Sequence, residues 1–224
     1  MKITAEFITS AAGAADFPAD GLPEVALVGR SNVGKSSLIN ALLRQRIART
    51  SAAPGKTRLA NVYRVTRDSS RPLYLVDLPG FGYARAQRQT QGQVAPAFDE
   101  IAEAAFERHP AALLLVDIRH PGLENDRAAW QWLQRATDRA AIVGTKVDKL
   151  ARGQRIRALR ELESVFEDSV LPVSAVTGEG LDELWKLIDR LVSTHNPINP
   201  HRRSSIPRRE TAPRRPSKVE GPKK

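Results

Sequence analysis

The sequence contains no cysteine and no long hydrophobic run. The lack of cysteine excludes disulfides, thiolate catalysis and cysteine-ligated zinc sites. The longest apolar run, residues 111–116, is far too short to span a bilayer. Residues 1–7 carry no continuous apolar stretch, so we expect no signal peptide. These absences lead us to expect a cytoplasmic protein that has no membrane partner.

Positive charge is distributed unevenly along the 224 residues, whose net charge is +10. Residues 201–224 contain nine Arg or Lys and two Glu, interrupted by Pro and Ser, with almost no apolar residue. Such a segment cannot bury enough surface to offset its ordering entropy. We therefore predict three regions: an N-terminal segment, 1–22, packed on or leading into the domain; one folded domain, 23–195; and a basic, disordered tail, 196–224.

Short apolar runs alternate with helical patterns in the folded region. The runs are of the kind found in parallel strands that are covered on both faces, and they occupy residues 25–28, 73–76, 111–116 and 141–143. Apolar residues at helical spacing mark residues 98–106, 130–136, 156–166 and 181–191. A further strand is expected at 61–65, with a place at the sheet edge. The alternation predicts an α/β domain with a mostly parallel, doubly wound sheet and helices on both faces.

Residues 29–36, Gly-Arg-Ser-Asn-Val-Gly-Lys-Ser, match the phosphate-loop pattern G-x-x-x-x-G-K-[ST]. The glycines let the backbone approach phosphate oxygens. Lys35 would place its charge on the β- and γ-phosphates, and Ser36 would offer its hydroxyl to Mg²⁺. A predicted strand precedes the loop and a predicted helix follows it, so the helix N-terminus adds partial positive charge.

A second motif, Asp77-Leu78-Pro79-Gly80, follows the strand predicted at 73–76, where open α/β sheets bind their ligands. Asp77 can hold Mg²⁺ through water, and the Gly80 N–H can meet the γ-phosphate. In the loop between the two motifs, Thr57 is the natural second hydroxyl for the metal. We expect Ser36, Thr57 and Asp77 to hold Mg²⁺. Lys35, Thr57 and Gly80 are expected to act in catalysis.

Two further motifs suit a guanine base. In Thr145-Lys146-Val147-Asp148, which resembles N-K-x-D, the Asp148 carboxylate can accept both N1–H and the exocyclic amine, a pattern that adenine does not present. The usual Asn is Thr here, which removes an amide contact. Ser174-Ala175-Val176 resembles the loop whose N–H meets the guanine carbonyl. The residues expected to bind GTP or GDP are Gly29, Arg30, Ser31, Asn32, Val33, Gly34, Lys35, Ser36, Ser37, Gly55, Lys56, Thr57, Asp77, Leu78, Pro79, Gly80, Thr145, Lys146, Val147, Asp148, Ser174, Ala175 and Val176.

Together these motifs resemble a TRAFAC-class GTPase with a Ras-like domain, and within that class the EngB (YihA or YsxC) family. The most specific pieces are GRSNVGKSSLIN at 29–40, RTSAAPGKT at 49–57, VDLPGFGYA at 76–84, DIRHP at 117–121 and TKVDKL at 145–150. The resemblance implies a bacterial protein needed for assembly of the large ribosomal subunit and for normal septation. Residues 85–93 do not align with the family pattern.

Three functions remain open from the sequence. The first is a GTPase acting on the large ribosomal subunit and its rRNA. The second is an RNA-binding module that uses GTP as an on/off ligand with negligible turnover. The third is a GTPase switch that is read by a division protein. Phe81, at the position where Ras-like enzymes have a water-orienting Gln, predicts slow hydrolysis. Asn32 raises the possibility of potassium as a cofactor. We expect a monomer.

Overall fold

The computed structural model describes residues 2–48, 59–68, 70–81 and 98–193, without the side chains of residues 98 and 99. Several predictions lie outside these ranges. They are the nucleotide-loop residues Gly55, Lys56 and Thr57, the segment 85–93 and the basic tail. No described helix is long and apolar enough to cross a membrane.

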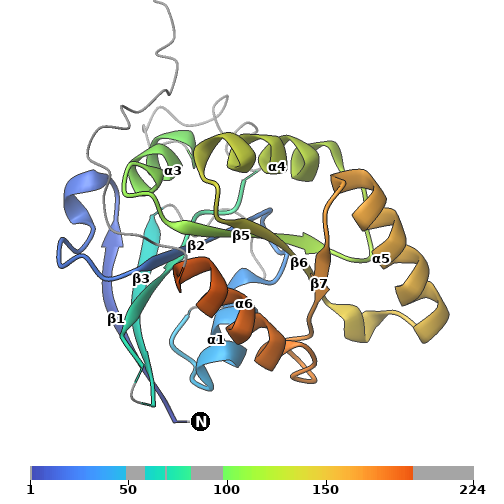
Figure 1. The fold of residues 1–224 in the computed structure, drawn as a ribbon, viewed down its shortest axis with the longest axis horizontal. Coiled ribbons are helices and arrows are strands. Elements are labelled where there is room, and N and C mark those ends of the chain that lie inside the picture. Colours follow the sequence, from blue (N-terminus) through green and yellow to red (C-terminus); the bar gives the residue numbers. More distant parts are fainter. Residues whose placement is uncertain (1, 49–58, 69, 82–97, 194–224) are drawn as a thin grey trace, which may run out of the picture.

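A sheet in the order β1-β3-β4-β2-β5-β6-β7 forms the centre of the fold (Figure 1). Strand β3 is antiparallel to both of its neighbours, and the strands from β4 to β7 in this order are parallel. The strand bounds are β1 Ile3–Ala11, β2 Glu24–Gly29, β3 Ala60–Arg67, β4 Leu73–Asp77, β5 Ala111–Asp117, β6 Ala140–Thr145 and β7 Val170–Pro172. The predicted Ras-like, mostly parallel α/β fold is therefore confirmed.

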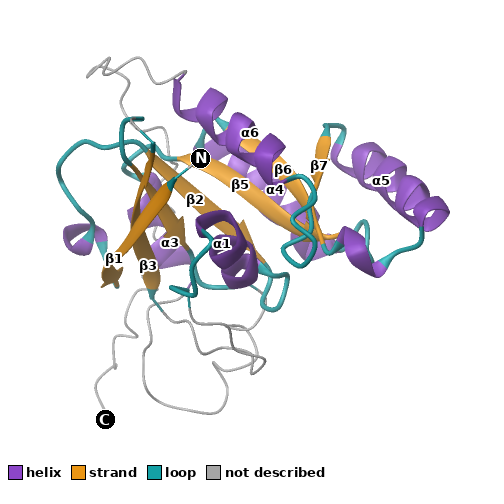
Figure 2. Ribbon diagram, turned by 90° about the horizontal axis from the view of Figure 1, so that it is seen from below, coloured by secondary structure: helices purple, strands orange, loops and turns teal. Residues whose placement is uncertain are grey.

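Helices cover both faces of the sheet (Figures 1 and 2). On one face the core includes side chains of α3, α4 and α5, and on the other it includes side chains of α1 and α6. The helix bounds are α1 Lys35–Leu43, α3 Phe98–Phe106, α4 Glu124–Ala136, α5 Arg152–Phe166 and α6 Leu181–Ser193, with short 3₁₀ turns at η1 Ala14–Asp16 and η2 Val147–Lys149.

The central strand β5 explains why its sequence is apolar without a break. All seven of its residues are buried. Ala112, Leu114 and Val116 face the α3–α4–α5 layer. The residues between them, such as Leu113 and Leu115, face the α1–α6 layer. Each such leucine contributes about 1.5–3 kcal/mol by leaving water. Because both faces of β5 are buried, its sequence lacks the alternation of apolar and polar residues that a half-exposed strand would show.

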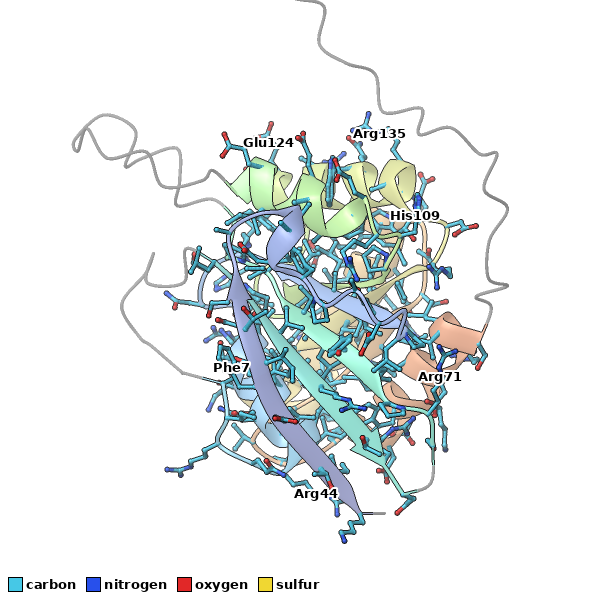
Figure 3. All side chains as sticks on the ribbon, turned by 90° about the vertical axis from the view of Figure 1, so that its left-hand side faces the viewer. Phe7, Arg44, Arg71, His109, Glu124 and Arg135 are labelled. Atoms are coloured by element: carbon cyan, nitrogen blue, oxygen red, sulfur yellow. The ribbon has the colours of Figure 1, made fainter. Side chains whose placement is uncertain are left out.

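One expectation about the strands is wrong, and one strand was not predicted. Strand β3 does not lie at the sheet edge, because β1 pairs with it along its outer side. Strand β1, which no sequence pattern predicted, is the true edge, and Figure 3 looks onto it. Phe7 of β1 is 47% exposed and packs edge-on against Tyr63 of β3, with ring centroids 5.9 Å apart.

One residue of the pattern that predicted α5 is also placed differently. Leu162 and Phe166 are buried in the core, and Leu159 packs against it. Ile156, which shares their spacing in the sequence, is 44% exposed. The first half of α5 therefore turns this apolar side chain to solvent, and the helix is anchored by its second half.

Candidate nucleotide-binding site

The predicted motifs follow the carboxyl ends of β2, β4, β6 and β7. These strands are parallel, so their carboxyl ends meet at one edge of the sheet. The structure thus brings the phosphate loop and the D-x-x-G segment to one side of the molecule. The two segments predicted to bind the guanine base, residues 145–148 and 174–176, lie on the same side, and we call them the base-reading loops.

The phosphate loop is preformed. Asn32 and Gly34 both adopt positive φ, at 63° and 110°, and the Val33 N–H donates to the Arg30 carbonyl at 3.2 Å. The ammonium of Lys35 lies 3.0 Å from the Gly29 carbonyl oxygen, so the loop folds around this side chain. Burial lowers the pKa of Lys35, and the nearby Asp77 carboxylate opposes that shift. A buried cation at the N-terminus of a helix suits a phosphate.

The metal-binding prediction can be tested on Asp77. This side chain is 2% exposed, and its Oδ2 accepts a hydrogen bond from the Ser36 hydroxyl at 3.3 Å. Its other oxygen, Oδ1, is buried and has no hydrogen-bond partner. Burial raises the pKa of Asp77 to about 6, although Lys35 and the Ser36 hydroxyl lower it. An uncompensated buried carboxylate oxygen beside a serine hydroxyl fits a hard divalent cation such as Mg²⁺.

The D-x-x-G segment lies directly against the phosphate loop. The Phe81 N–H donates to the Gly29 carbonyl at 3.3 Å, and the Ser31 N–H donates to the Phe81 carbonyl at 3.4 Å. A Cβ on Gly80 would lie only 2.7 Å from the Ser31 nitrogen. The Phe81 side chain is 9% exposed and belongs to the core. Its ring therefore lies in the core and offers no hydrogen-bonding group to orient water.

Asp148 and Ser174 form one unit. The Ser174 hydroxyl donates to Asp148 Oδ1 at 2.7 Å and accepts hydrogen bonds from the N–H groups of Val176 and Thr177, both at 3.1 Å. Burial raises the pKa of Asp148, but the hydrogen bonds from Ser174 and Lys149 outweigh it, so the net shift is downward. The carboxylate is thus ionised and oriented. That Asp148 accepts hydrogen bonds from a guanine base remains a prediction.

Thr145 braces the phosphate loop. Its side chain is buried, and its hydroxyl lies 2.8 Å from the Val33 carbonyl oxygen and 3.1 Å from that of Val116. The neighbouring Lys146 reaches the Asn32 carbonyl at 2.6 Å. These two side chains tie the base-reading loop to the phosphate loop across more than a hundred residues of sequence. The Thr145 hydroxyl thus contacts the backbone of both the phosphate loop and β5.

Sequence reasoning missed two carboxylates that organise the site. Asp117, at the end of β5, accepts hydrogen bonds from Lys146 at 2.9 Å and from the Arg119 guanidinium at 2.7 and 2.9 Å. Burial opposes ionisation of Asp117, but the contacts with Arg119 and Lys146 outweigh it and hold its pKa well below the usual range. Its position at the carboxyl end of a buried strand was the available signal, because Asp77 occupies the same position in β4.

The second missed carboxylate is Asp126, on α4. Arg30 Nε donates to both of its oxygens, at 2.8 and 3.0 Å, and the Asp126 side chain is 2% exposed. The side chain of Arg30 therefore joins the phosphate loop to α4. No local pattern marks this pair, which is 96 residues apart in sequence.

The geometry of the site defines the class of protein. A phosphate loop, a D-x-x-G segment and two base-reading loops on a Ras-like sheet are the parts of a P-loop GTPase.

A family described as a 50S ribosome-binding GTPase matches residues 24–146. The chain is 37% identical over 202 residues to a probable GTP-binding protein EngB of Alkaliphilus oremlandii, covering 87% of this chain and 93% of that protein. It is 42% identical over 198 residues to the EngB of Pelotomaculum thermopropionicum, covering 86% and 98%. The chain belongs to the EngB family of GTP-binding proteins.

A solved structure of Era in complex with MgGDPNP and nucleotides 1506–1542 of 16S ribosomal RNA has the same fold. The two share a TM-score of 0.64 and 25% sequence identity. The match covers 81% of this chain and 60% of the Era chain.

Proposed function

We propose that this protein hydrolyses GTP to GDP and phosphate with Mg²⁺, and that it acts in assembly of the large ribosomal subunit. The observation that carries the first part is Asp77, whose buried Oδ1 has no partner and whose Oδ2 meets Ser36. In the Era complex the nucleotide analogue is bound with Mg. When bound here, Mg²⁺ would supply positive charge to the phosphates and orient them.

The protein's own residues have separate tasks in this proposal. Ser36 and Asp77 hold the metal, together with Thr57, which lies outside the described residues. Lys35 binds the β- and γ-phosphates through its ammonium, and the Gly80 N–H donates to the γ-phosphate. Catalysis then depends on positioning and electrostatics, which dominate phosphoryl transfer.

Phosphate release and GTP affinity test the proposal. Lys35→Ala should nearly abolish nucleotide binding. Ser36→Ala and Thr57→Ala should impair hydrolysis in the presence of Mg²⁺. EDTA should remove most of the activity of the intact protein. Ser164→Ala, on an exposed position of α5, is the matched control and should behave as the intact chain. Unchanged GTP affinity and turnover in Thr57→Ala would contradict the assignment of that loop. Tight GTP binding without measurable turnover in the intact protein would favour the module that uses GTP only as an on/off ligand.

Slow intrinsic hydrolysis follows from Phe81, because a buried aromatic ring cannot orient water. We propose potassium as a compensating charge near Asn32, whose backbone has a φ of 63° and whose side chain is exposed. Hydrolysis should be faster in potassium than in sodium buffer of equal ionic strength. Identical rates would remove potassium from the proposal.

The ribosomal part of the proposal is supported by the family description and by the RNA in the Era complex. We propose a cytoplasmic monomer that contacts the large subunit and its rRNA, and whose loss disturbs septation. Sucrose-gradient profiles of cells depleted of the protein should show accumulating large-subunit precursors. Normal subunit profiles together with defective septation would instead favour a switch read by a division protein.

A further inference from the structure

Helix α5 lies at the end of the sheet opposite β1, beside β7 (Figures 1 and 2). Its first nine residues carry four arginines and no acidic residue. Arg155 pairs with Glu179. The other three, Arg152, Arg157 and Arg160, are exposed, and none of them forms a salt bridge within the part of the chain that the structure describes. We call these three residues and Ile156 the α5 basic face.

The placement of Arg152, the first residue of α5, opposes helix stability. A helix N-terminus carries partial positive charge, so a cation in the first turn is unfavourable by about 0.3–1 kcal/mol. Helices α4 and α6 follow the ordinary preference, with two acidic residues each in the first turn. Helix α5 has none there. This cost to stability at an exposed position points to a binding role for Arg152.

The α5 basic face is regular. Arg152, Ile156 and Arg160 are separated by four residues each, so they follow one line along the helix. They span about 12 Å at a rise of 1.5 Å per residue. Ile156, 44% exposed, lies between the two cations of this line. A row of guanidinium groups around one apolar side chain can contact both phosphates and the sugars between them.

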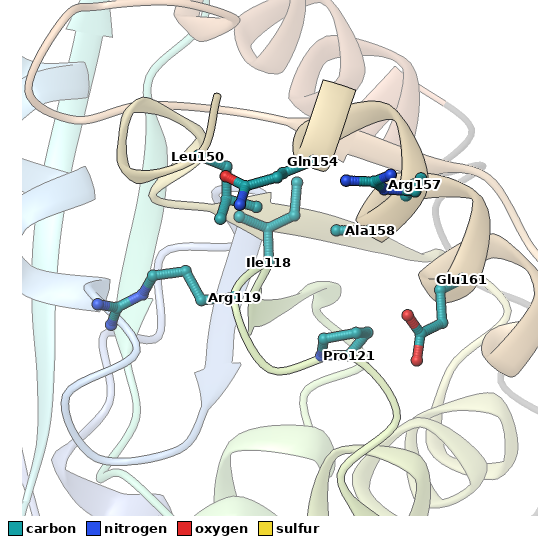
Figure 4. A pocket seen from close by; sticks show the side chains of 8 residues that line it. All are labelled: Ile118, Arg119, Pro121, Leu150, Gln154, Arg157, Ala158 and Glu161. Atoms are coloured by element: carbon teal, nitrogen blue, oxygen red, sulfur yellow. The ribbon is translucent and has the colours of Figure 1, made fainter. Parts of the chain in front are cut away.

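The α5 basic face also borders the nucleotide site. A hollow between α5 and residues 118–121 is lined by both Arg157 and Arg119 (Figure 4). Arg119 is the residue that holds Asp117, which in turn holds Lys146 of the base-reading loop. A ligand on α5 would therefore lie beside residues that contact the nucleotide loops.

We infer that the α5 basic face binds the sugar–phosphate backbone of duplex RNA. The inference rests on the proposed ribosomal function for the choice of RNA, and on charge complementarity for the site. All cations of the face are arginine, which suits phosphate through its planar fork. A bilayer surface fits poorly, since the main apolar face of α5 is already buried in the core.

Full-length protein tests the inference. The triple variant Arg152→Gln, Arg157→Gln, Arg160→Gln is compared with a control triple, Arg44→Gln, Arg127→Gln, Arg135→Gln, which removes three arginines elsewhere on the surface. Binding to a 30-base-pair RNA duplex of arbitrary sequence and to purified large subunits is measured between about 50 and 200 mM salt. The α5 variant should bind the duplex about 10-fold more weakly, and its log–log salt slope should fall by about 0.7–0.9 for each phosphate that is no longer neutralised. GTP binding should stay unchanged, which verifies folding.

Several outcomes overturn the inference. One is equal duplex affinity and salt slope for the α5 variant and the control triple. Another is loss of large-subunit binding with intact duplex binding, which would assign the face to a ribosomal protein. A third concerns the variant with lysine at all three positions. Lysine keeps the positive charge, so loss of the salt slope in this variant would contradict an electrostatic contact. Failure of the proposed function looks different: the intact protein would bind the duplex but show no affinity for large subunits.

Discussion

The Asp148–Ser174 pair shows how one side chain orients another at the candidate site. Asp148 is polar and only 10% exposed at its side chain, yet Ser174 satisfies one oxygen and Lys149 lies 3.3 Å from the other. Its pKa is lowered in spite of burial. The carboxylate is therefore held as an acceptor, which is the state that guanine N1–H and its amine require.

Asp148→Asn should exchange the preferred base. An amide at this position still accepts from Ser174 through its oxygen, but it presents N–H donors where guanine also presents donors. We expect GDP affinity to fall at least about 100-fold and xanthosine diphosphate to bind more tightly than GDP. Calorimetric titration with both nucleotides measures this. An unchanged GDP affinity, or equal affinity of the intact protein for ATP and GTP, would contradict the assignment.

Asp117 gives a pH-dependent prediction. Burial raises the pKa of Asp117, but Arg119 and Lys146, the cations that face it, lower it by more, so the net shift is downward. The carboxylate of Asp126 also lies nearby. A carboxylate with a lowered pKa in the folded state stabilises that state fully above its ordinary pKa of about 3.9. The contribution is lost as the pH falls below that value, because the unfolded chain takes up the proton first.

Asp117→Asn should therefore lower the free energy of unfolding by about 1–3 kcal/mol at pH 7. The difference from the intact protein should persist at pH 5 and shrink progressively below pH 4. Denaturant titrations at several pH values measure it. Asp138→Asn, whose side chain is 87% exposed, is the control and should change little. A difference that is the same at pH 7 and pH 3 would show that the ion pairs are not its source.

At the scale of elements, the segment that follows β4 lies directly against the phosphate loop. Two backbone hydrogen bonds join Phe81 to Gly29 and Ser31. Gly80 has no room for a side chain, because a Cβ would lie 2.6–2.8 Å from three atoms of Ser31. Glycine is thus required here for close approach of two backbones.

Gly80→Ala should reduce the rate of GTP hydrolysis at least about 10-fold, since the added methyl group must push the D-x-x-G segment away from Ser31. Gly153→Ala is the matched control. Nothing lies within 4 Å of a Cβ at that position in α5. It should hydrolyse GTP at the normal rate and gain about 0.5–1 kcal/mol of stability. Equal turnover in the two variants would contradict the role of the close contact.

At the scale of the whole molecule, positive charge is concentrated outside the described domain. Residues 201–224 hold nine cations and two glutamates. We propose that this basic tail tethers the protein to ribosomal RNA without base specificity, since contacts to phosphates carry no sequence information. The tail and the α5 basic face would then contribute separately to one salt-dependent interaction.

Deleting residues 201–224 should weaken binding to large subunits and lower the log–log salt slope by about 0.7–0.9 for each phosphate that the tail neutralises. GTP affinity should hardly change, because every nucleotide motif ends by Val176. Filter binding at several salt concentrations measures both quantities. If the truncated chain binds large subunits as tightly and with the same slope, the folded domain carries the recognition alone.

The sequence by itself determined the features that depend on local pattern. Continuous apolar runs identified β2, β4, β5 and β6, because strands buried on both faces have no polar side. The glycines and Lys35 of the phosphate loop, together with Asp77, were identifiable because each motif lies at the carboxyl end of such a strand. Ser174 was identifiable from the Ser-Ala-Val pattern of its loop. The alternation of strands and helices was sufficient for the fold class.

Only the tertiary structure decided which distant residues meet. Strand β1 finds its place by pairing with β3, and its short polar alternation carries no information about that partner. The contacts of Arg30 with Asp126 and of Lys146 with Asp117 join segments 96 and 29 residues apart. The helical spacing of Ile156 likewise could not reveal that α5 extends past the core there. Such contacts depend on packing in three dimensions, whereas a sequence pattern records only what each segment requires of its immediate surroundings.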